Sequence, residues 1–402
     1  MRIGIDLYGF DPDYSGGVST FVLGLTNGLL NNLTKTDIVT ILISEKNENQ
    51  LRSSFDKKSV SFVKISVSKW YRYFNRALWL LSWVLQNFKL RFWFDKYFRS
   101  RTMRMIDESI DILISPATVL NFFALEKPTV LCVHDIQQEY HPEFFTFNQL
   151  ILRWAAYRLS CWRAAAIQVS SIYIQDCLIE KYLFIKPDKI FVAHEGVDLE
   201  KFSTQLPGER PESIGQLERE SFVFYPAQLW PHKNHMLLVY ALSNFLEKTG
   251  NELPCVLTGY DYGYWEKIKE LINKHHLKQI YYLGRVSFNE LLWLYQNCSA
   301  VLALGLHESS SLPVREGAVF GKPLICSNIP PNIETQEFLN LNIVDKNDSY
   351  ELSETCVALV ENRDALYGAS IKNVSLVKVF DWNQIAKKYI LEINSVCRHK
   401  DI

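Results

Sequence analysis

The stretch "LALGLHESSSLPVREGAVFGKPLICS", residues 302–327, carries the clearest indication of the fold. It begins and ends with apolar runs, and acids, serines and a proline lie between them. Nearly continuous apolar runs are typical of strands buried on both faces of a parallel sheet. A proline near the start of "LPVREGAVFG" suits the first turn of a helix, where its missing N–H costs least. The stretch therefore predicts a strand, a short helix and a second strand.

The same alternation of apolar runs and helical stretches continues along the rest of the chain. Repeated βαβ units of this kind predict an α/β protein with parallel sheets. Ligands of such sheets bind beyond the carboxyl ends of the strands. The strands are predicted within residues 2–6, 38–44, 112–115, 129–135, 166–171, 189–196, 222–228, 254–259, 279–284, 299–305 and 322–327.

The length of 402 residues predicts two or three domains, at about 100–200 residues per domain. The polar segment 203–220, which contains proline and glycine and lacks apolar periodicity, is predicted to be a linker. We expect two doubly wound domains, at 1–202 and 221–375, with the binding site in the cleft between them. The tail 376–402 has helical spacing of apolar residues and is predicted to be a final helix.

The composition is that of an ordinary soluble globular protein, with 48% hydrophobic and 22% charged residues. A formal net charge of -1 provides no global field that would select nucleic acid as a partner. Eight scattered cysteines form no CxxC pair or Cys/His cluster, which predicts buried thiols in a reducing compartment and no metal site. Because the sequence also has no signal-peptide pattern and no run of about 18 apolar residues, we expect a cytoplasmic protein.

One segment departs from this average. Residues 68–105 carry nine basic residues and one acid, with Trp, Tyr and Phe among them. Basic heads beside aromatic bodies suit a helix that lies in a membrane interface. The alternative is an amphipathic helix packed on its own domain, with its arginines facing water. Both interpretations stay open, because the local charge excess is larger than an amphipathic core helix needs.

The opening stretch also contains a candidate site. Glu308 follows the predicted strand, the serines lie at the strand-to-helix turn, and Glu316 lies in the first turns of the helix. Backbone N–H groups at such a turn can bind phosphate, and the two carboxylates can accept hydrogen bonds from the hydroxyls of a sugar and a ribose. On spacing alone, an ordinary first-turn acid and a surface acid explain the pattern better.

A resemblance changes that balance. The segment "ESSSLPVREGAVFGKPLI" resembles the signature "EGFGLPxLEAxAxGxPVI" of the retaining GT-B glycosyltransferases of family 4. Ser309 and Ser311 stand where the pattern has glycine, and Ser310 stands where it has phenylalanine. The resemblance implies two Rossmann-like domains that face a cleft, with the C-terminal helix crossing back to the N-terminal domain. The matching positions are Glu308, Leu312, Pro313, Glu316, Gly321 and Pro323.

Two further motifs carry the resemblance into the first half of the chain. "DPDYSGGVSTFVLGL" resembles the first glycine-rich turn of the family, in which Gly16 and Gly17 would let the donor diphosphate or the acceptor approach. "TVLCVHDIQQEYHPEFF" resembles the "HDL…PEYF" motif, which implies that His134 lies near the donor sugar and the attacking hydroxyl. The plainer alternatives are a β-to-α turn and a structural histidine.

The second half carries three more motifs. "VFYPAQLWPHKN" resembles "YVGxLxPRKN", which implies that Lys233 pairs with the donor diphosphate, while His232 and Gln228 stand where members carry arginine. In "YYLGRVSFNELL", the backbone at Arg285 and Val286 would flank the nucleobase. "HEGVDLEKF" resembles "NGVDxxxF", and "FDWNQIAKK" resembles "FSWEKxAxx" in the final helix.

The resemblance implies a reaction. A retaining, metal-independent enzyme would move a hexose from a nucleotide diphosphate sugar to a glycan or lipid-linked acceptor in the synthesis of surface polysaccharide. A donor similar to UDP-glucose is favoured, and GDP-mannose is the next candidate. The enzyme needs no cofactor beyond this donor, and the expected location is the cytoplasm, with peripheral contact at the inner face of the membrane left open. Its implied catalytic residues are His134, Glu308 and Lys233. Its implied donor-contacting residues are Gly16, Gly17, Gln228, His232, Lys233, Arg285, Val286, Ser309, Ser310, Ser311, Leu312 and Glu316.

Two other functions stay open at this point. A non-hydrolysing sugar-nucleotide epimerase shares the two-domain fold, although the E-x7-E register argues against it. A non-catalytic, nucleotide-binding partner of another transferase would explain the glutamine at position 228 and the serines at 309–311.

Overall fold

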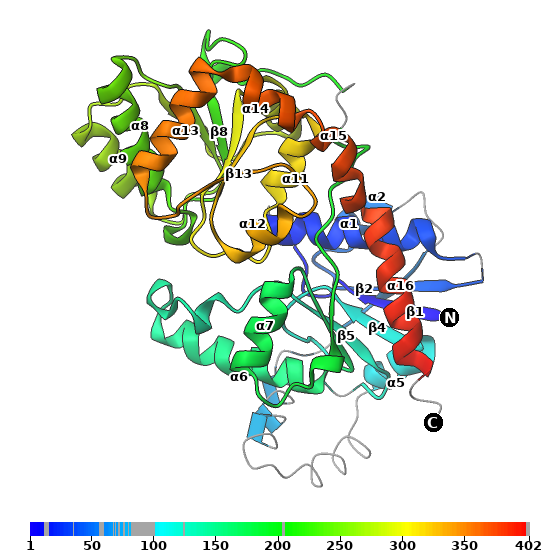
Figure 1. Cartoon of the computed structure of the whole chain (residues 1–402). Coiled ribbons are helices and arrows are strands. Elements are labelled where there is room, and N and C mark those ends of the chain that lie inside the picture. Colours follow the sequence, from blue (N-terminus) through cyan, green and yellow to red (C-terminus); the bar gives the residue numbers. More distant parts are fainter. Residues whose placement is uncertain are drawn as a thin grey trace. The chain divides into compact units, whose positions relative to one another are not determined.

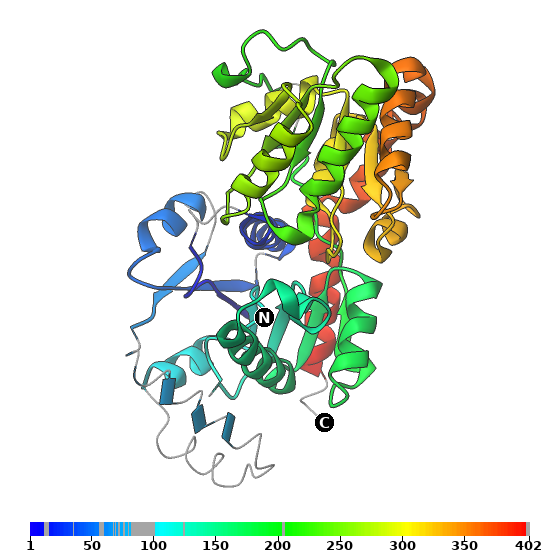
Figure 2. The ribbon, with the colours of Figure 1, turned by 90° about the vertical axis from the view of Figure 1, so that its left-hand side faces the viewer.

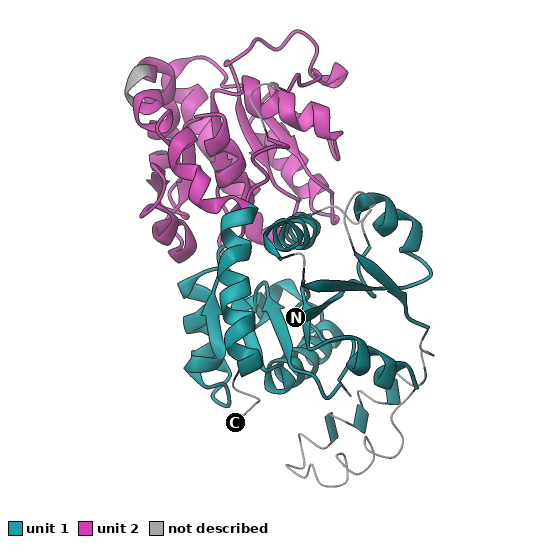
Figure 3. Cartoon of the chain, turned by 90° about the vertical axis from the view of Figure 1, so that its right-hand side faces the viewer, with its two compact units in different colours: residues 1–194, 382–402 teal, residues 195–381 magenta. Residues whose placement is uncertain are grey.

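The structure is a computed structural model of the whole chain (Figure 1). It divides into two compact units: unit 1 is Met1–His194 with Trp382–Ile402, and unit 2 is Glu195–Asp381 (Figure 3). The described residues are 1–11, 16–34, 36–55, 60–66, 68, 70, 73–74, 77–78, 80–81, 101–123, 125–202 and 206–398.

Unit 1 is built on a seven-stranded parallel sheet with the order β3-β2-β1-β4-β5-β6-β7. The strand order reverses between β1 and β4, and ligands of doubly wound sheets bind beside such a switch point. The strands are β1 (Arg2–Asp6), β2 (Ile38–Ile43), β3 (Ser61–Lys64), β4 (Ile112–Ser115), β5 (Thr129–Val133), β6 (Ala166–Val169) and β7 (Ile190–Val192).

The last helix of the chain, α16 (Trp382–Arg398), belongs to unit 1 and packs against α1 (Gly17–Asn32), as Figures 1 and 2 show. Its contact is close, because a Cβ at Gly28 would lie 2.4 Å from the carbonyl oxygen of Trp382. The apolar positions 382, 385, 389 and 393, which predicted this helix, are all buried. Among its described residues, unit 1 also has the α-helices α2 (Glu48–Phe55), α5 (Arg101–Ser109), α6 (Phe147–Arg163) and α7 (Ile172–Lys181).

Unit 2 is built on a six-stranded parallel sheet with the order β10-β9-β8-β11-β12-β13. Its order reverses between β8 and β11, which places a second switch point at the carboxyl ends of these two strands. The strands are β8 (Val223–Pro226), β9 (Cys255–Thr258), β10 (Ile280–Tyr282), β11 (Ala300–Ala303), β12 (Leu324–Ser327) and β13 (Asn342–Val344).

Helices cover both faces of the second sheet (Figure 1). One core packs α8 (His235–Thr249), α9 (Trp265–Lys274) and α13 (Ser349–Glu361) on one face. The other core packs α10 (Phe288–Asn297), α11 (Leu312–Val319) and the 3-10 helix η6 (Val377–Phe380) on the opposite face. Short helices α12 (Pro330–Thr335), α14 (Arg363–Ser370) and α15 (Asn373–Leu376) complete the unit. The predicted α/β class with parallel, doubly buried strands is confirmed.

The unit boundaries differ from the predicted domain boundaries. The division falls after His194 instead of after residue 202, and residues 206–220 of the predicted linker lie within unit 2. Packing explains this: the N–H of Glu209 donates to the carbonyl of Asn289 at 2.9 Å, and Ile214 is buried. Residues 376–381 also fall in unit 2, before the helix that returns to unit 1.

Most of the basic aromatic segment 68–105 lies outside the described residues, so the membrane prediction is not addressed by the structure. Within the described ranges, no helix combines the length and the apolar character that a membrane span requires. All eight cysteines are free thiols, and seven of them are buried.

Candidate active site

Lys233 and Glu308 form an ion pair at the carboxyl edge of the second sheet. Lys233 ends the 3-10 helix η5 (Pro231–Lys233) that follows β8, and Glu308 lies in the loop after β11. The Nζ of Lys233 and the Oε1 of Glu308 are 2.5 Å apart, and both side chains are largely buried. Because β8 and β11 flank the switch point of this sheet, the pair lies where a doubly wound sheet binds its ligand.

The backbone around this pair is firmly held. The hydroxyl of Tyr225 donates to the carbonyl of Lys233, and the N–H of Leu306 donates to the carbonyl of His232 at 2.7 Å. The second bond joins the loop after β8 to the loop after β11. A Cβ at Gly305 would lie 2.5 Å from the Oε1 of Glu308, so the absence of a side chain there leaves room for the carboxylate.

Glu316 lies on α11, and its carboxylate is paired with a tyrosine instead of a cation. The hydroxyl of Tyr295, on α10, donates to its Oε2 at 2.5 Å. Burial raises the pKa of Glu316, although this bond and Lys201 oppose the shift. Tyr295 is fully buried against Phe224 and was not predicted from the sequence.

The serines precede α11 as predicted, with Ser311 at its N-cap and a proline in its first turn. Ser310 accepts a hydrogen bond from Nη1 of Arg315, whose side chain is 2% exposed. Nearby is Glu195, also buried, whose carboxylate interacts with both Arg315 and Ser310. The sequence did not single out Glu195 or Arg315, although both depart from the family patterns quoted above.

The remaining donor-contacting candidates of unit 2 lie at the same edge of its sheet. The Oε1 of Gln228 accepts from the indole N–H of Trp230 at 3.1 Å. The ring of His232 lies 6.0 Å from that of Trp230, centroid to centroid. Arg285 and Val286 follow β10, and Arg285 is exposed while Val286 is half-buried.

His134 lies at the carboxyl end of β5 in unit 1. Its Nε2 is 3.0 Å from the carbonyl of Pro116, and its backbone N–H donates to the hydroxyl of Thr118 at 3.3 Å. Since a carbonyl only accepts, Nε2 carries the proton and Nδ1 is the acceptor nitrogen of the neutral ring. Burial lowers the pKa of His134, which favours this neutral form. The ring packs edge-on against Phe21, with centroids 4.7 Å apart.

Gly16 and Gly17 begin α1, beyond the end of β1. Asp6, which ends β1 and was not predicted as a site residue, accepts from the side chain of Asn121 at 3.1 Å. The ends of β1, β4 and β5 therefore gather polar groups at the carboxyl edge of the first sheet.

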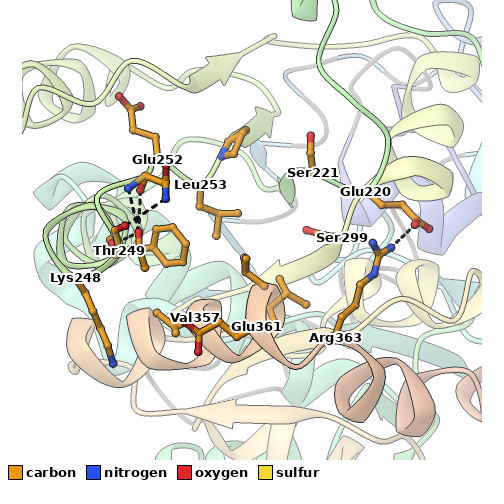
Figure 4. Close-up of a pocket in the computed structure, with 15 residues that line it drawn as sticks. Glu220, Ser221, Lys248, Thr249, Glu252, Leu253, Ser299, Val357, Glu361 and Arg363 are labelled. Atoms are coloured by element: carbon orange, nitrogen blue, oxygen red, sulfur yellow. Dashed lines mark hydrogen bonds and ion pairs between the residues drawn. The ribbon is translucent and has the colours of Figure 1, made fainter.

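A pocket of about 740 Å³ lies elsewhere in unit 2 (Figure 4). Its lining includes Ser221, Pro254 and Ser299, which immediately precede or flank the amino ends of β8, β9 and β11, and the Glu220–Arg363 ion pair. None of the predicted site residues lines it.

Comparison with known proteins identifies the class. The family described as "Glycosyltransferase Family 4" matches residues 15–201, and the family described as "Glycosyl transferases group 1" matches residues 209–373. Their boundary falls between the two sheets. The chain belongs to the group 1 glycosyltransferases with the GT-B fold.

Individual relatives are more distant. The chain is 24% identical over 206 residues, 51% of its length and 54% of the relative's, to the O-antigen chain mannosyltransferase RfbU of Salmonella typhimurium. It is 42% identical over 69 residues, 17% of its length and 18% of the relative's, to the UDP-Gal:alpha-D-GlcNAc-diphosphoundecaprenol alpha-1,3-galactosyltransferase of Escherichia coli. The chain thus spans about half the length of the mannosyltransferase and less than a fifth of the galactosyltransferase.

The fold is similar to that of HepE from Anabaena, solved in complex with UDP and glucose. The TM-score is 0.69 at 16% identity, and the match covers 98% of this chain and 100% of the other. This likeness supports the assignment of the fold.

Proposed function

We propose that this protein transfers a hexose from a nucleotide diphosphate sugar to a glycan or lipid-linked acceptor in surface polysaccharide biosynthesis. The observation that carries the proposal is the Lys233–Glu308 pair at the switch point of the second sheet. At this position the Lys233 cation can pair with a diphosphate, and the Glu308 carboxylate can accept a hydrogen bond from a sugar hydroxyl.

The names of the relatives support the kind of donor and acceptor. RfbU is an O-antigen chain mannosyltransferase, and the galactosyltransferase acts from UDP-Gal on a diphosphoundecaprenol-linked sugar. HepE was solved with UDP and glucose. We propose a UDP-hexose such as UDP-glucose as the donor, with GDP-mannose as the next candidate.

The chemistry follows from the charges. The bond between the anomeric carbon and the β-phosphate oxygen breaks, and negative charge develops on that phosphate. Lys233 and the backbone N–H groups before α11 stabilise this charge, which is the type of interaction that lowers a barrier most. Glu308 accepts hydrogen bonds from the sugar hydroxyls, and Glu316 accepts them from the ribose.

The proposed stereochemical outcome is retention. The acceptor oxygen attacks the anomeric carbon on the face that the phosphate leaves, and the departing phosphate oxygen takes the acceptor's proton. His134, neutral in this environment, offers Nδ1 as an acceptor to a substrate hydroxyl. Proton NMR of the first product formed reads the anomeric configuration, and an inverted product contradicts this route.

We further propose that Lys233 and backbone amides take the role that a divalent metal plays in other transferases. The expected result is full transfer activity after dialysis against EDTA. Loss of activity on chelation, restored by Mg²⁺ or Mn²⁺, contradicts the proposal.

The first experiment is calorimetric titration of the purified protein with UDP, GDP, ADP and dTDP, beside a Glu316→Ala variant. Micromolar binding of one nucleotide, weakened in the variant, supports the donor site and identifies the base. If none binds, or if the variant binds equally well, the donor site is wrong and a non-catalytic role is favoured.

The acceptor side includes a membrane proposal. We propose that the basic aromatic segment 68–105 contacts the anionic inner face of the membrane, where lipid-linked acceptors are found. The full chain should then co-sediment with vesicles that contain anionic lipid and not with neutral vesicles. Absence of sedimentation with the anionic vesicles contradicts peripheral attachment.

A further inference from the structure

Three of the positions at which this chain departs from the family patterns lie together in unit 2. Glu195 replaces the asparagine of "NGVD", Ser310 replaces the phenylalanine of "EGFG", and Arg315 replaces the leucine before the second glutamate. An amide and two apolar residues are thus replaced by a carboxylate, a hydroxyl and a guanidinium. The three introduced groups interact with one another.

Arg315 is the central member of this group. It lies on α11 immediately before Glu316, and its guanidinium packs over the ring of Phe380 with 4.5 Å from Cζ to the ring centroid. The side chain is 2% exposed, and although burial lowers the pKa of Arg315 to about 10, the group keeps its charge at neutral pH. A buried charge of this kind requires a charged or polar partner.

Ser310 and Glu195 are two such partners, and Glu334 also favours the charge of Arg315 electrostatically. Nη1 of Arg315 donates to the hydroxyl of Ser310, and that hydroxyl has one proton of its own to donate onward. The carboxylate of Glu195 interacts with Ser310 and with Arg315, and both interactions favour its charged form against burial. Glu195 is itself buried, so its charge also requires these partners.

The group lies directly beside the proposed donor site. Ser310 is two residues after Glu308, and Glu195 also interacts electrostatically with Glu308 and Lys233. The family pattern has glycines on both sides of residue 310, whereas this chain has serines. Serine allows the backbone less freedom than glycine. The hydrogen bonds of Ser310 therefore also restrict the position of Glu308, two residues away.

We propose that Glu195, Ser310 and Arg315 form a positioning network that fixes segment 308–311 and thereby selects the sugar of the donor through Glu308. The proposal rests on the proposed function, because it assumes that Glu308 faces the sugar. It concerns the sugar alone, since Glu316 and the region after β10 are the proposed contacts of the nucleoside.

The test compares UDP with UDP-glucose as ligands of the full-length protein, by calorimetry. The variants are Ser310→Ala, Arg315→Leu, Glu195→Asn, and the double variant Glu195→Asn/Arg315→Leu, which has the family residues at both positions. Each variant of the network should bind UDP-glucose at least tenfold more weakly, while its affinity for UDP changes less than twofold. Arg363→Leu is the matched control, because the ion pair of Arg363 with Glu220 lies at the opposite edge of the same sheet. The ratio of the affinities for UDP-glucose and UDP in this variant should equal the ratio in the wild type.

Thermal unfolding separates positioning from mere support of the fold. Arg315→Leu should lower the unfolding temperature, because it removes the cation that most favours the charge of the buried Glu195 carboxylate, and the double variant should recover part of that loss. The affinity of the double variant for UDP-glucose should stay low. The network has no positioning role if the double variant recovers both the unfolding temperature and the affinity for UDP-glucose. The same conclusion follows if Ser310→Ala leaves the ratio of the affinities for UDP-glucose and UDP unchanged. If the wild-type protein binds neither UDP nor another nucleotide, the proposed function itself fails.

Discussion

The ammonium of Lys233 and the carboxylate of Glu308 are 2.5 Å apart, although 74 residues separate them in the chain. The pair exists because β8 and β11 are neighbours in the second sheet and each continues into a loop at the same edge. The two charges are within hydrogen-bond distance, so the two residues are expected to act as one unit.

Replacement of Lys233 by methionine should reduce transfer by about 100-fold or more, because no cation then meets the charge on the leaving phosphate. The rate of nucleotide release from the donor in the presence of acceptor measures this. Lys248→Met is the control: the exposed side chain of Lys248 on α8 pairs with that of Glu354 on α13 of the same unit and should be dispensable. Retention of more than a tenth of the wild-type rate by Lys233→Met contradicts the role of this residue.

The bond from Tyr295 to Glu316 provides a second prediction. Tyr295→Phe removes the hydroxyl and leaves a buried carboxylate without that donor, so the free energy of unfolding should fall by about 1–3 kcal/mol. The affinity for the donor nucleotide should fall too, because Glu316 is the proposed partner of the ribose. Denaturant titration and calorimetry give the two values.

Tyr367→Phe is the matched control for this substitution. The hydroxyl of Tyr367 donates to the carbonyl of Ser299 at 2.9 Å, at the amino edge of the same sheet. Its loss should lower stability and leave nucleotide affinity unchanged. Equal nucleotide affinity in both variants is the result that contradicts the assignment of Glu316 to the ribose.

Glu195 predicts an unusual dependence of stability on pH. Burial raises its pKa to about 7, opposed in part by Arg315 and Lys233 and reinforced by Glu308. Between its unfolded value of about 4.5 and 7, the folded state binds more protons than the unfolded state. Stability must therefore fall as pH rises through this window, and the cost is fully present above pH 7.

Glu195→Gln removes this titration. The difference in free energy of unfolding between wild type and variant should change by about 3 kcal/mol at most between pH 4.5 and 8, in favour of the variant at high pH, because each pKa unit corresponds to about 1.4 kcal/mol. Denaturant titrations at four or more pH values measure it. A difference that does not vary with pH shows that Glu195 keeps its ordinary pKa.

Local pattern was enough to predict most of the fold. All eleven predicted apolar runs contain an observed strand, because a strand buried on both faces has a continuous apolar sequence. Within the described ranges two strands were missed, β3 and β13, which lie at the edges of their sheets, are short, and have mostly half-exposed or exposed residues. Edge strands carry a weaker apolar signal because one side has no neighbour.

Some residues of the candidate site could be predicted from local motifs, and others could not. Lys233, Glu308 and Glu316 lie within motifs whose spacing is local, so the sequence could indicate them. Tyr295 and Glu195 meet their partners only through tertiary packing, and no local pattern encodes that contact. A signal for Glu195 did exist, since an ionisable residue that replaces a neutral one within a motif requires a partner elsewhere.

The docking of α16 on α1 provides the last prediction. A Cβ at Gly28 would lie 2.4 Å from the carbonyl oxygen of Trp382, which is backbone and cannot rotate away. Gly28→Ala should therefore destabilise unit 1 by about 1–3 kcal/mol through overpacking, although alanine favours a helix by itself. Gly368→Ala is the matched control, because a Cβ there meets no atom within 4 Å and should stabilise α14 by about 0.5–1 kcal/mol. Opposite shifts in the unfolding temperature are expected, and a rise in both variants means that α16 can move away from α1 without cost.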